Sequence, residues 1–228
     1  MKRKFKTVVL FLGWAVSKAA GKKDTKQKIL NSAELLFAEQ GFNDTSLRQI
    51  TSAADVNLAS VNYHFGSKKD LIKAVMDRYL AIFMPRADAA LRQLLIDPAI
   101  NLHQVFDSFV APLMELTDIK RRGPEIFLQL LGRGYIDNQG FLRWFIVNHY
   151  GEVLEHFTQA IHKAAPALSS ADVFWRLHFT LGTVVFTMAS SEALRDIAKA
   201  DFDEDIDVEG LVRKVIPYLA SGVGAKPC

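Results

Sequence analysis

Two short helical patterns joined by a tight turn occupy Ser46 to Leu71, and this arrangement constrains the fold more than any other feature of the chain. Ser46 and Gln49 are spaced as a capping box, in which each side chain satisfies a backbone N–H left unpaired by the start of a helix. A helix is therefore predicted from about Leu47. Asp55 then tolerates the left-handed backbone that a tight reversal requires. The stretch is predicted to form a helix-turn-helix.

The second helical pattern has the composition of a helix that reads DNA. Asn57 is placed to cap it, and Leu58, Val61 and Phe65 recur at helical spacing and are expected to bury one face. Small side chains let a helix backbone approach a groove floor, and amide and hydroxyl groups match base edges. The remaining positions carry these residue types: Asn57, Ala59, Ser60, Asn62, Tyr63 and His64. An ordinary helical hairpin with a solvated face is the alternative.

Positive charge is concentrated in the part of the chain that contains this motif. Residues 1–80 carry fourteen Lys and Arg against seven Asp and Glu, whereas residues 81–228 carry fourteen against eighteen. The whole-chain net charge of +3 would be weak evidence for nucleic acid. The asymmetry instead places an electrostatic footprint on the half that needs phosphate contacts.

The segment from about Thr25 to Leu80 resembles the DNA-binding domain of TetR-type transcriptional repressors. The matching positions are Ile29, Ala33, Leu36, Phe37, Gly41, Phe42, Thr45, Ser46, Ile50, Ala54, Val56, His64-Phe65, Ser67-Lys68 and Leu71. The resemblance implies that the third helix enters the major groove and that Lys68 contacts the DNA backbone. The full predicted DNA-contacting set is Thr45, Ser46, Arg48, Asn57, Leu58, Ala59, Ser60, Asn62, Tyr63, His64 and Lys68.

Two positions depart from the pattern of that family. This chain has Asp55 where Gly is common and Asn62 where Tyr is common. The tyrosine contact of relatives therefore does not transfer to position 62. Tyr63 could supply a displaced version, and Asn62 could address the N6 and N7 atoms of adenine.

Beyond Leu80 the sequence predicts helices throughout, because strand-like alternation bounded by paired turns does not occur. Ser67 is placed to cap a fourth helix that reaches Pro85 or passes it. Later helices are expected at about 101–117, 124–137, 140–163, 170–199 and 208–220. We expect an all-α fold with an extension over 1–23, a three-helix helix-turn-helix domain over 24–70, and a helical bundle over 71–228 for ligand binding and dimerisation.

The segment from Val173 to Met188 is hydrophobic nearly all round. A helix tolerates this only when both faces are covered. One cover could be the protein's own core and the other a second subunit; a deeply buried helix in a monomer is the alternative. The resemblance implies that the last two helices pair across a two-fold axis in a homodimer.

Aromatic and aliphatic side chains crowd the middle helices, and most of them suit a core. The resemblance implies an effector cavity there, and this composition would accept an elongated apolar molecule with one polar end. The candidate lining residues are Phe109, Leu113, Phe127, Leu131, Arg133, Tyr135, Trp144, His149, Trp175, Arg176 and Phe179, with His178 as a further polar candidate. The segments FWRLHFTLG and NLASVNYHFGSKKDLI are similar to PsrA-like regulators of fatty-acid metabolism. That similarity implies a long-chain fatty acid or acyl-CoA, with its acidic head group facing an arginine.

The first residues have the outline of a secretory signal peptide. Lys2-Arg3-Lys4 precedes the apolar run from Thr7 to Val16, and small residues follow at Ala19-Ala20. Ten helical residues span about 15 Å, too short for a membrane anchor. Because a secreted helix-turn-helix would never meet an operator, we expect a mis-set translation start or a disordered basic arm in a cytoplasmic protein. The single cysteine, Cys228, permits no intrachain disulfide.

No catalytic pattern stands out in the sequence. His149, Glu152 and His156 could share a helix face and hold a metal, but no further ligand is obviously placed to complete the shell. We therefore expect no enzyme activity, cofactor or metal, and instead a ligand-responsive repressor that binds a palindromic double-stranded operator. The competing class is a helical lipid- or acyl-binding protein without specific DNA recognition.

Overall fold

The computed structural model describes residues 24–137 and 140–226. The expectations for the extension over residues 1–23 and for Cys228 lie outside the described residues. All regular elements within the described ranges are helices, which confirms the all-α prediction. The chain separates into two compact units, one ending at Val75 and the other beginning at Met76.

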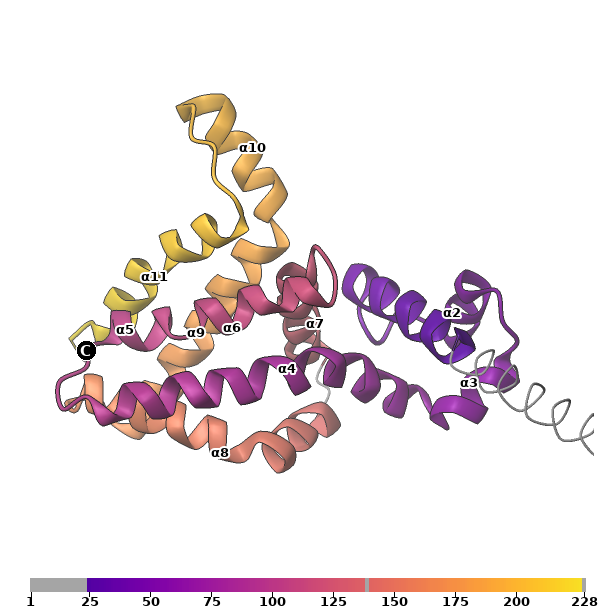
Figure 1. Cartoon of the computed structure of the whole chain (residues 1–228), viewed down its shortest axis with the longest axis horizontal. Coiled ribbons are helices and arrows are strands. Elements are labelled where there is room, and N and C mark those ends of the chain that lie inside the picture. The colour runs from indigo at the N-terminus through magenta and orange to yellow at the C-terminus, as the bar shows by residue number, and fades with distance from the viewer. Residues whose placement is uncertain (1–23, 138–139, 227–228) are drawn as a thin grey trace, which may run out of the picture. The chain divides into compact units, whose positions relative to one another are not determined.

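The first unit contains three helices and the start of a fourth. The first helix covers residues 24–40, α2 spans Leu47–Ala54, α3 spans Leu58–Phe65, and α4 begins at Lys68 (Figure 1). Its core consists of apolar side chains that exclude solvent completely: Ile29, Ala33, Phe37, Phe42, Ile50, Val61, Leu71 and Val75. The rings of Phe37 and Phe42 meet edge to face at 5.2 Å between centroids. The first helix therefore forms the support on which α2 and α3 pack.

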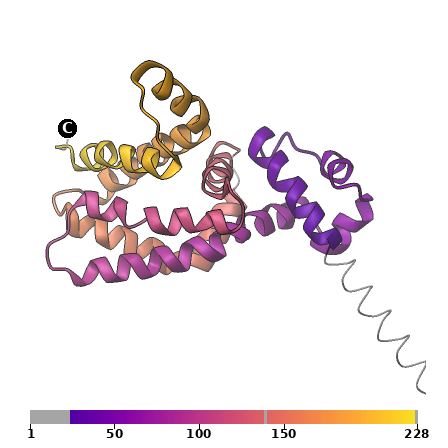
Figure 2. The same ribbon diagram turned by 45° about the horizontal axis from the view of Figure 1, so that its top comes forward.

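The second unit is built from the rest of α4 and from the helices that follow it (Figure 2). Their bounds are α4 Lys68–Ile96, α5 Leu102–Asp107, α6 Val110–Met114, the 3₁₀ helix η1 Glu115–Asp118, α7 Gly123–Ile136, α8 Gly140–Ala164, α9 Ser170–Ala189, α10 Ser191–Phe202 and α11 Val208–Gly224. Within the described ranges, no helix is long and apolar enough to span a membrane.

Three of the helices expected from the sequence are interrupted. The one expected over 140–163 is α8, which is kinked at Tyr150, where φ is −132° and ψ is 24°. The segment predicted as 101–117 breaks between α5 and α6 at Ser108 and Phe109. Pro112 accounts for this break, since it lacks the N–H that would bond to Ser108 and its ring crowds that carbonyl. The segment predicted as 170–199 breaks at Ser190, whose φ of −101° and ψ of 11° end α9. By contrast, α4 runs through Pro85 to Ile96.

Polar contacts fasten α8 to α4 along its second half. His156 Nδ1 lies 2.7 Å from Asp88 Oδ1, and Lys163 Nζ donates to the carbonyl of Leu95 at 2.8 Å. Arg92 Nε also donates to Asp88 at 2.7 Å. Because Asp88 is mostly buried, its hydrogen bonds are partly shielded from water. This carboxylate is therefore a principal tie between the two helices.

We predict that Asp88→Asn lowers the free energy of unfolding by about 1–3 kcal/mol at neutral pH, because charge-assisted hydrogen bonds are lost. Burial raises the pKa of Asp88, but hydrogen bonds from His156 and Arg92 outweigh it, so the folded pKa is lowered. Such a carboxyl stabilises the fold above its unfolded pKa of about 3.9, and the stabilisation disappears as pH falls through the folded value.

The measurement is urea denaturation of the unaltered protein and of the Asp88→Asn variant, from about pH 7 to about pH 3. The difference between them should shrink below about pH 4. Asp118→Asn, at an exposed position, is the control and should change stability by less than about 0.5 kcal/mol. A deficit of Asp88→Asn that stays constant down to about pH 3 would contradict the assigned role.

Candidate nucleic-acid interface and effector site

The turn between α2 and α3 has the geometry that the sequence predicts. Ser46 and Gln49 form the capping box, with Gln49 N–H donating to Ser46 Oγ at 3.2 Å and Ser46 N–H donating to Gln49 Oε1 at 2.7 Å. Asp55 adopts left-handed backbone with φ 52° and ψ 52°. Asn57 caps α3, its Oδ1 accepting the Ser60 N–H at 2.9 Å. The helix-turn-helix prediction is confirmed in its local details.

The outward face of α3 is polar and aromatic. Asn57, Ala59, Asn62 and Tyr63 are exposed, and 68% of the Tyr63 surface is accessible. The ring of Tyr63 meets that of His64 edge to face at 5.1 Å. Val61 alone of the three expected core positions is fully buried, while Leu58 is 43% exposed. The prediction that Leu58 helps to bury the inner face was therefore wrong.

Three predicted DNA-contacting residues lie before α3, and they are placed differently. Thr45 is fully buried, and its hydroxyl donates to the carbonyls of Leu36 and Gly41. Its side chain therefore anchors the start of α2 on the first helix. Ser46 and Arg48, in contrast, are exposed.

Lys68 stands at the first position of α4. Its Nζ donates to the carbonyl of Asn43 at 3.3 Å, which holds the amine beside the loop that precedes α2. Ser67 caps the same helix, because Asp70 N–H donates to Ser67 Oγ at 3.1 Å. The hydrogen bond from Ser67 lowers the pKa of Asp70, and Lys73 lowers it further. The start of α4 thus combines a fixed helix terminus with a lysine.

A column of aromatic rings runs through the second unit. Tyr79 stacks on Phe127 at 5.8 Å, Phe83 lies 5.1 Å from Phe127 and 6.2 Å from Phe109, and Phe109 meets Phe157 at 5.0 Å. The structure therefore brings the candidate residues Phe109 and Phe127 together. Leu113 is buried on α6, while Leu131 and Arg133 are half-buried on α7.

Tyr79, Phe83 and Phe157 were not among the candidate effector residues, although they belong to this column. Tyr79 and Phe83 are four residues apart and lie on α4, where they continue the apolar stripe of Leu71 and Val75. This four-residue spacing could have identified Tyr79 and Phe83 as core residues of the second unit, because it continues the apolar face of α4 beyond Val75.

Other effector candidates lie at the surface instead. Tyr135, Trp144, Trp175 and Phe179 are between 54% and 65% exposed. His149 is exposed, and its Nδ1 lies 2.9 Å from the Phe145 carbonyl. The structure therefore separates the buried and half-buried candidates from an exposed group. The interpretation of Val173 to Met188 as a deeply buried monomeric helix is also wrong, because α9 exposes Phe174, Trp175, Phe179 and Phe186.

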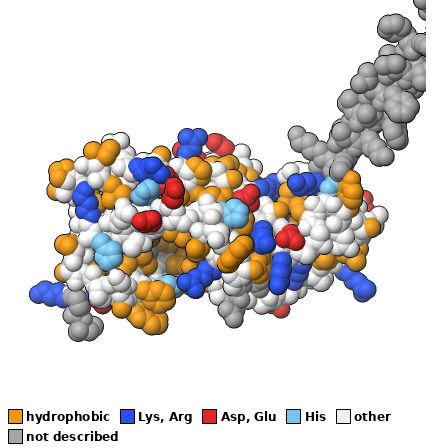
Figure 3. Space-filling model, turned by 90° about the horizontal axis from the view of Figure 1, so that it is seen from below, with side chains coloured by type: hydrophobic (Ala, Val, Ile, Leu, Met, Phe, Trp, Pro, Cys, Tyr) orange, Lys and Arg blue, Asp and Glu red, His pale blue; other side chains and the backbone are white. Residues whose placement is uncertain are grey.

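Three of the four exposed aromatics of α9 share a side of the helix. Trp175, Phe179, Gly182 and Phe186 recur at alternating spacings of four and three residues, which form one stripe on an α-helix. Hydrophobic side chains also reach the surface at several places on the face of the molecule shown in Figure 3. Scattered exposure of that kind is ordinary in a soluble protein, whereas a contiguous stripe marks an interaction surface.

Arg176 has a different role from the one that the sequence suggested. Its Nη1 donates to the carbonyls of Val223 and Ala225 at 2.6 and 2.5 Å, at the end of α11. Helix C-termini present unpaired carbonyls and a partial negative charge, which a guanidinium satisfies. Arg176 thus fastens α9 to the end of α11.

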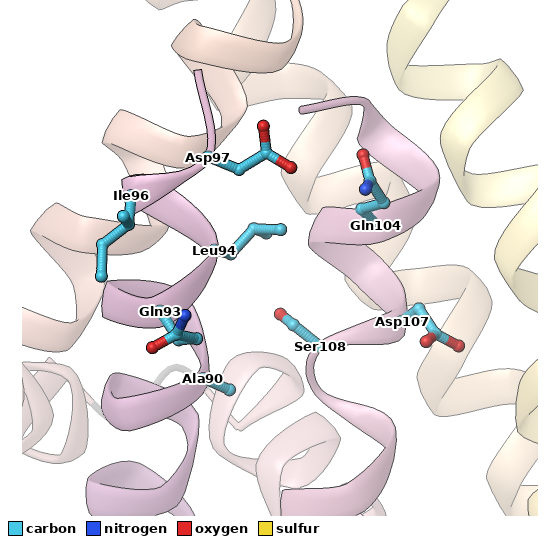
Figure 4. A pocket seen from close by; sticks show the side chains of 8 residues that line it. All are labelled: Ala90, Gln93, Leu94, Ile96, Asp97, Gln104, Asp107 and Ser108. Atoms are coloured by element: carbon cyan, nitrogen blue, oxygen red, sulfur yellow. The ribbon is translucent and has the colours of Figure 1, made fainter. Parts of the chain in front are cut away.

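An open cleft of about 600 Å³ lies between the end of α4 and α5 (Figure 4). Its lining residues are Ala90, Gln93, Leu94, Ile96, Asp97, Gln104, Asp107 and Ser108. None of the eight is among the effector candidates. The cleft therefore does not coincide with the predicted effector site.

The three residues weighed as metal ligands do not contact one another, although Arg92 links the partners of two of them, since it pairs with both Asp88 and Glu152. His156 pairs with Asp88, Glu152 lies 3.5 Å from Arg92, and His149 contacts its own helix backbone. In the described part of the chain, no group of three or more His, Cys, Asp or Glu residues is arranged to hold a metal ion.

The capped reversal and the exposed face of α3 define a helix-turn-helix module, and comparisons with known proteins agree. The family profile "Bacterial regulatory proteins, tetR family" matches residues 29–75. The profile "Tetracyclin repressor-like, C-terminal domain" matches residues 107–222, about half of the chain. The chain therefore belongs to the TetR family of bacterial regulatory proteins, which are DNA-binding regulators rather than enzymes.

Curated relatives match over short stretches of the chain. The probable regulator YttP of Bacillus subtilis is 41% identical over 58 residues, which are 25% of this chain and 28% of YttP. The repressor NicS of Pseudomonas putida is 35% identical over 81 residues, 36% of this chain and 38% of NicS. The matched stretches thus span less than half of these relatives.

Solved structures support the same architecture over most of the chain. Two mutant forms of the protein HlyIIR align with TM-scores of 0.53 and 0.54 at 19% and 21% identity. Each alignment covers 90% of this chain, and 100% and 98% of the respective HlyIIR chains. At this level of identity the likeness shows a shared fold.

We predict that Asn62→Ala weakens binding to the specific operator by about 1–3 kcal/mol while leaving affinity for random DNA nearly unchanged, because an amide on the outward face of α3 can contact a base edge. Lys68→Ala provides the contrast: it should weaken both and lower the slope of log affinity against log salt by about one unit, as expected for a lost phosphate contact.

Both variants would be titrated against operator and random duplexes at several salt concentrations. If Asn62→Ala lost the same binding free energy on operator and random DNA, Asn62 would not take part in base recognition. If the slope of log affinity against log salt were unchanged in Lys68→Ala, Lys68 would not contact a phosphate.

Proposed function

We propose that the protein is a homodimeric transcriptional repressor that binds a palindromic operator and is released by a long-chain fatty acid or its acyl-CoA. The exposed polar face of α3, held by the capped reversal at Asp55, carries the DNA-binding part of this proposal. Repression at an operator places the protein in the cytoplasm. NicS and BepR are named as repressors, which supports this direction of control.

The dimer would form through α9 and α11. Phe179 and Phe186 of α9 are each 65% exposed, and Tyr218 of α11 is 67% exposed. A two-fold axis would place the same stripe on both copies in mutual contact, which removes these rings from water. Dimerisation also suits the DNA interface, because two copies of α3 can address half-sites about one helical turn apart.

The aromatic column supports an elongated apolar effector. Phe83, Phe109 and Phe157 are half-buried, so the column is not sealed by its own side chains. An acyl chain entering it would bury methylenes at about 0.8 kcal/mol each. Arg133 is the arginine proposed for the acidic head group, since it lies on α7 with Phe127.

Release follows from linkage between effector and DNA. An effector shifts the protein away from the operator only if it binds the DNA-incompetent conformation more tightly. α4 is the helix through which such a change would pass, because it begins beside the helix-turn-helix at Lys68 and contributes Tyr79 and Phe83 to the column.

We predict that oleoyl-CoA dissociates a preformed operator complex at lower concentration than octanoyl-CoA, because a longer chain buries more methylenes. Fluorescence anisotropy of a labelled operator would follow the release. Free CoA is the control and should have no effect. Equal potency of the two acyl-CoAs, or no release by either, would reject the acyl effector while leaving the operator-binding function in place.

Replacing the proposed head-group partner gives a second prediction. Arg133→Ala should raise the concentration of oleoyl-CoA needed for release by roughly tenfold, in line with the loss of one charge-assisted hydrogen bond. Operator affinity without the acyl-CoA should stay unchanged. Arg121→Ala, at an exposed loop position, is the matched control. If the two variants respond alike, Arg133 is not the anchor.

A further inference from the structure

We propose that α10 is an arm that packs on a second copy of the chain, at the edge of the face formed by α9 and α11. The proposal rests on the dimer described under the proposed function. It adds a contact that the pairing of α9 and α11 does not require, made by a helix that the sequence alone did not separate from α9.

The sequence of α10 gives it an apolar side that its own chain leaves open. Ala193, Ile197 and Ala200 are spaced four and three residues apart and therefore share a face. All three are exposed, Ile197 to 53%, and Phe202 at the helix end is 75% exposed. In this fully described helix, Ser191 is the one buried residue.

A helix of this kind lacks the packing that usually stabilises one. α10 has 12 residues, and isolated helices shorter than about 12–15 residues are marginal in water. Most helical stability in proteins comes from burial of an apolar face. The covering surface for Ala193, Ile197 and Ala200 must therefore come from outside this chain if α10 is to be firmly held.

Polar contacts on the other side of α10 fix its direction. Arg195 Nε donates to the Ile206 carbonyl at 2.7 Å, and Lys199 Nζ pairs with Asp203 at 3.0 Å. The connecting loop is tied to α11 in turn, where Lys214 Nζ lies 2.5 Å from Glu204. Exposed ion pairs of this type add little stability. They orient the arm so that its apolar side faces away from the loop.

The position of α10 in the chain identifies its partner. It joins the end of α9 to the start of α11, the two helices proposed to form the dimer, and it stands away from α4, α5, α6 and α8 in both ribbon views (Figures 1 and 2). An arm at the edge of a two-fold interface lies beside the other copy, because symmetry brings the partner's α9 and α11 to the same edge. The occupant of the apolar side is thus a second copy of this chain.

The first test measures subunit exchange in the full chain. Copies labelled with donor or acceptor dye at the single cysteine, Cys228, are mixed, and energy transfer reports exchange. Ile197→Glu should speed exchange at least about tenfold, since changes at an interface act mainly on dissociation. Lys199→Gln, on the polar side of α10, should exchange at the original rate. Far-UV circular dichroism checks that both variants remain folded.

A second test locates the contact directly and does not depend on a destabilising change. The variant carries Ala200→Cys together with Cys228→Ser, and its new cysteine is labelled with a photo-reactive benzophenone. The labelled protein is mixed with isotopically heavy protein and then irradiated. Mass spectrometry recognises links between copies by the isotope label. The expected products join α10 of one copy to peptides of α9 or α11 of the other.

The proposed arm would be wrong if Ile197→Glu exchanged subunits at the original rate and all cross-links stayed within one copy. The proposed dimer through α9 and α11 would not be affected by this result. A different result marks failure of the underlying dimer: if the unaltered chain sediments as a monomer at micromolar concentration, the proposed interface through α9 and α11 fails, and the arm fails with it.

Discussion

The DNA-binding face depends on one local constraint, the reversal of the backbone at Asp55. A left-handed residue at the end of α2 lets α3 begin after Asn57, while full burial of Val61 against the first unit's core fixes the rotation of α3 about its axis. With that rotation fixed, Asn62 and Tyr63 are directed to solvent. Many L-residues would be strained at this conformation, but Asp tolerates it because its short polar side chain bonds locally.

The second unit shows the complementary arrangement of a core with unfinished surfaces. Its aromatic column links α4 with α7 and α8, and the Asp88 carboxylate ties α4 to α8 beside it. α9 and α11 instead present rings to solvent, joined to each other by the guanidinium of Arg176. The buried column suits an apolar ligand and the exposed stripe suits a symmetric partner, so one unit has the surfaces for both.

Features encoded within a few residues were predictable from the sequence. The capping pair of Ser46 and Gln49, the cap at Asn57 and the turn at Asp55 each depend on side chains that bond to neighbouring backbone. The all-helical fold followed from the periodicity of apolar residues and the absence of strand-like alternation. The break at Pro112 was also locally encoded, by the N–H that proline lacks, although it was not recognised.

Features that depend on distant neighbours were not predictable. Trp175 and Phe179 have the composition of a pocket lining, and only the packing of α9 against α7 and α11 shows that they face outward. Arg176 looked like a ligand anchor because its use by the end of α11, 47 residues further on, leaves no mark in the local sequence. The role of Thr45 was obscured in the same way, since its bonds reach back to Leu36.

The central claim is that two copies of this chain recognise a defined DNA sequence. Selection of bound duplexes from a random pool, followed by titration and stoichiometry on the enriched sequence, tests it most directly. The account predicts an inverted repeat, bound by two chains at least about a thousandfold more tightly than random DNA at physiological salt. Recovery of no common sequence, with weak binding that scales only with salt, would contradict it.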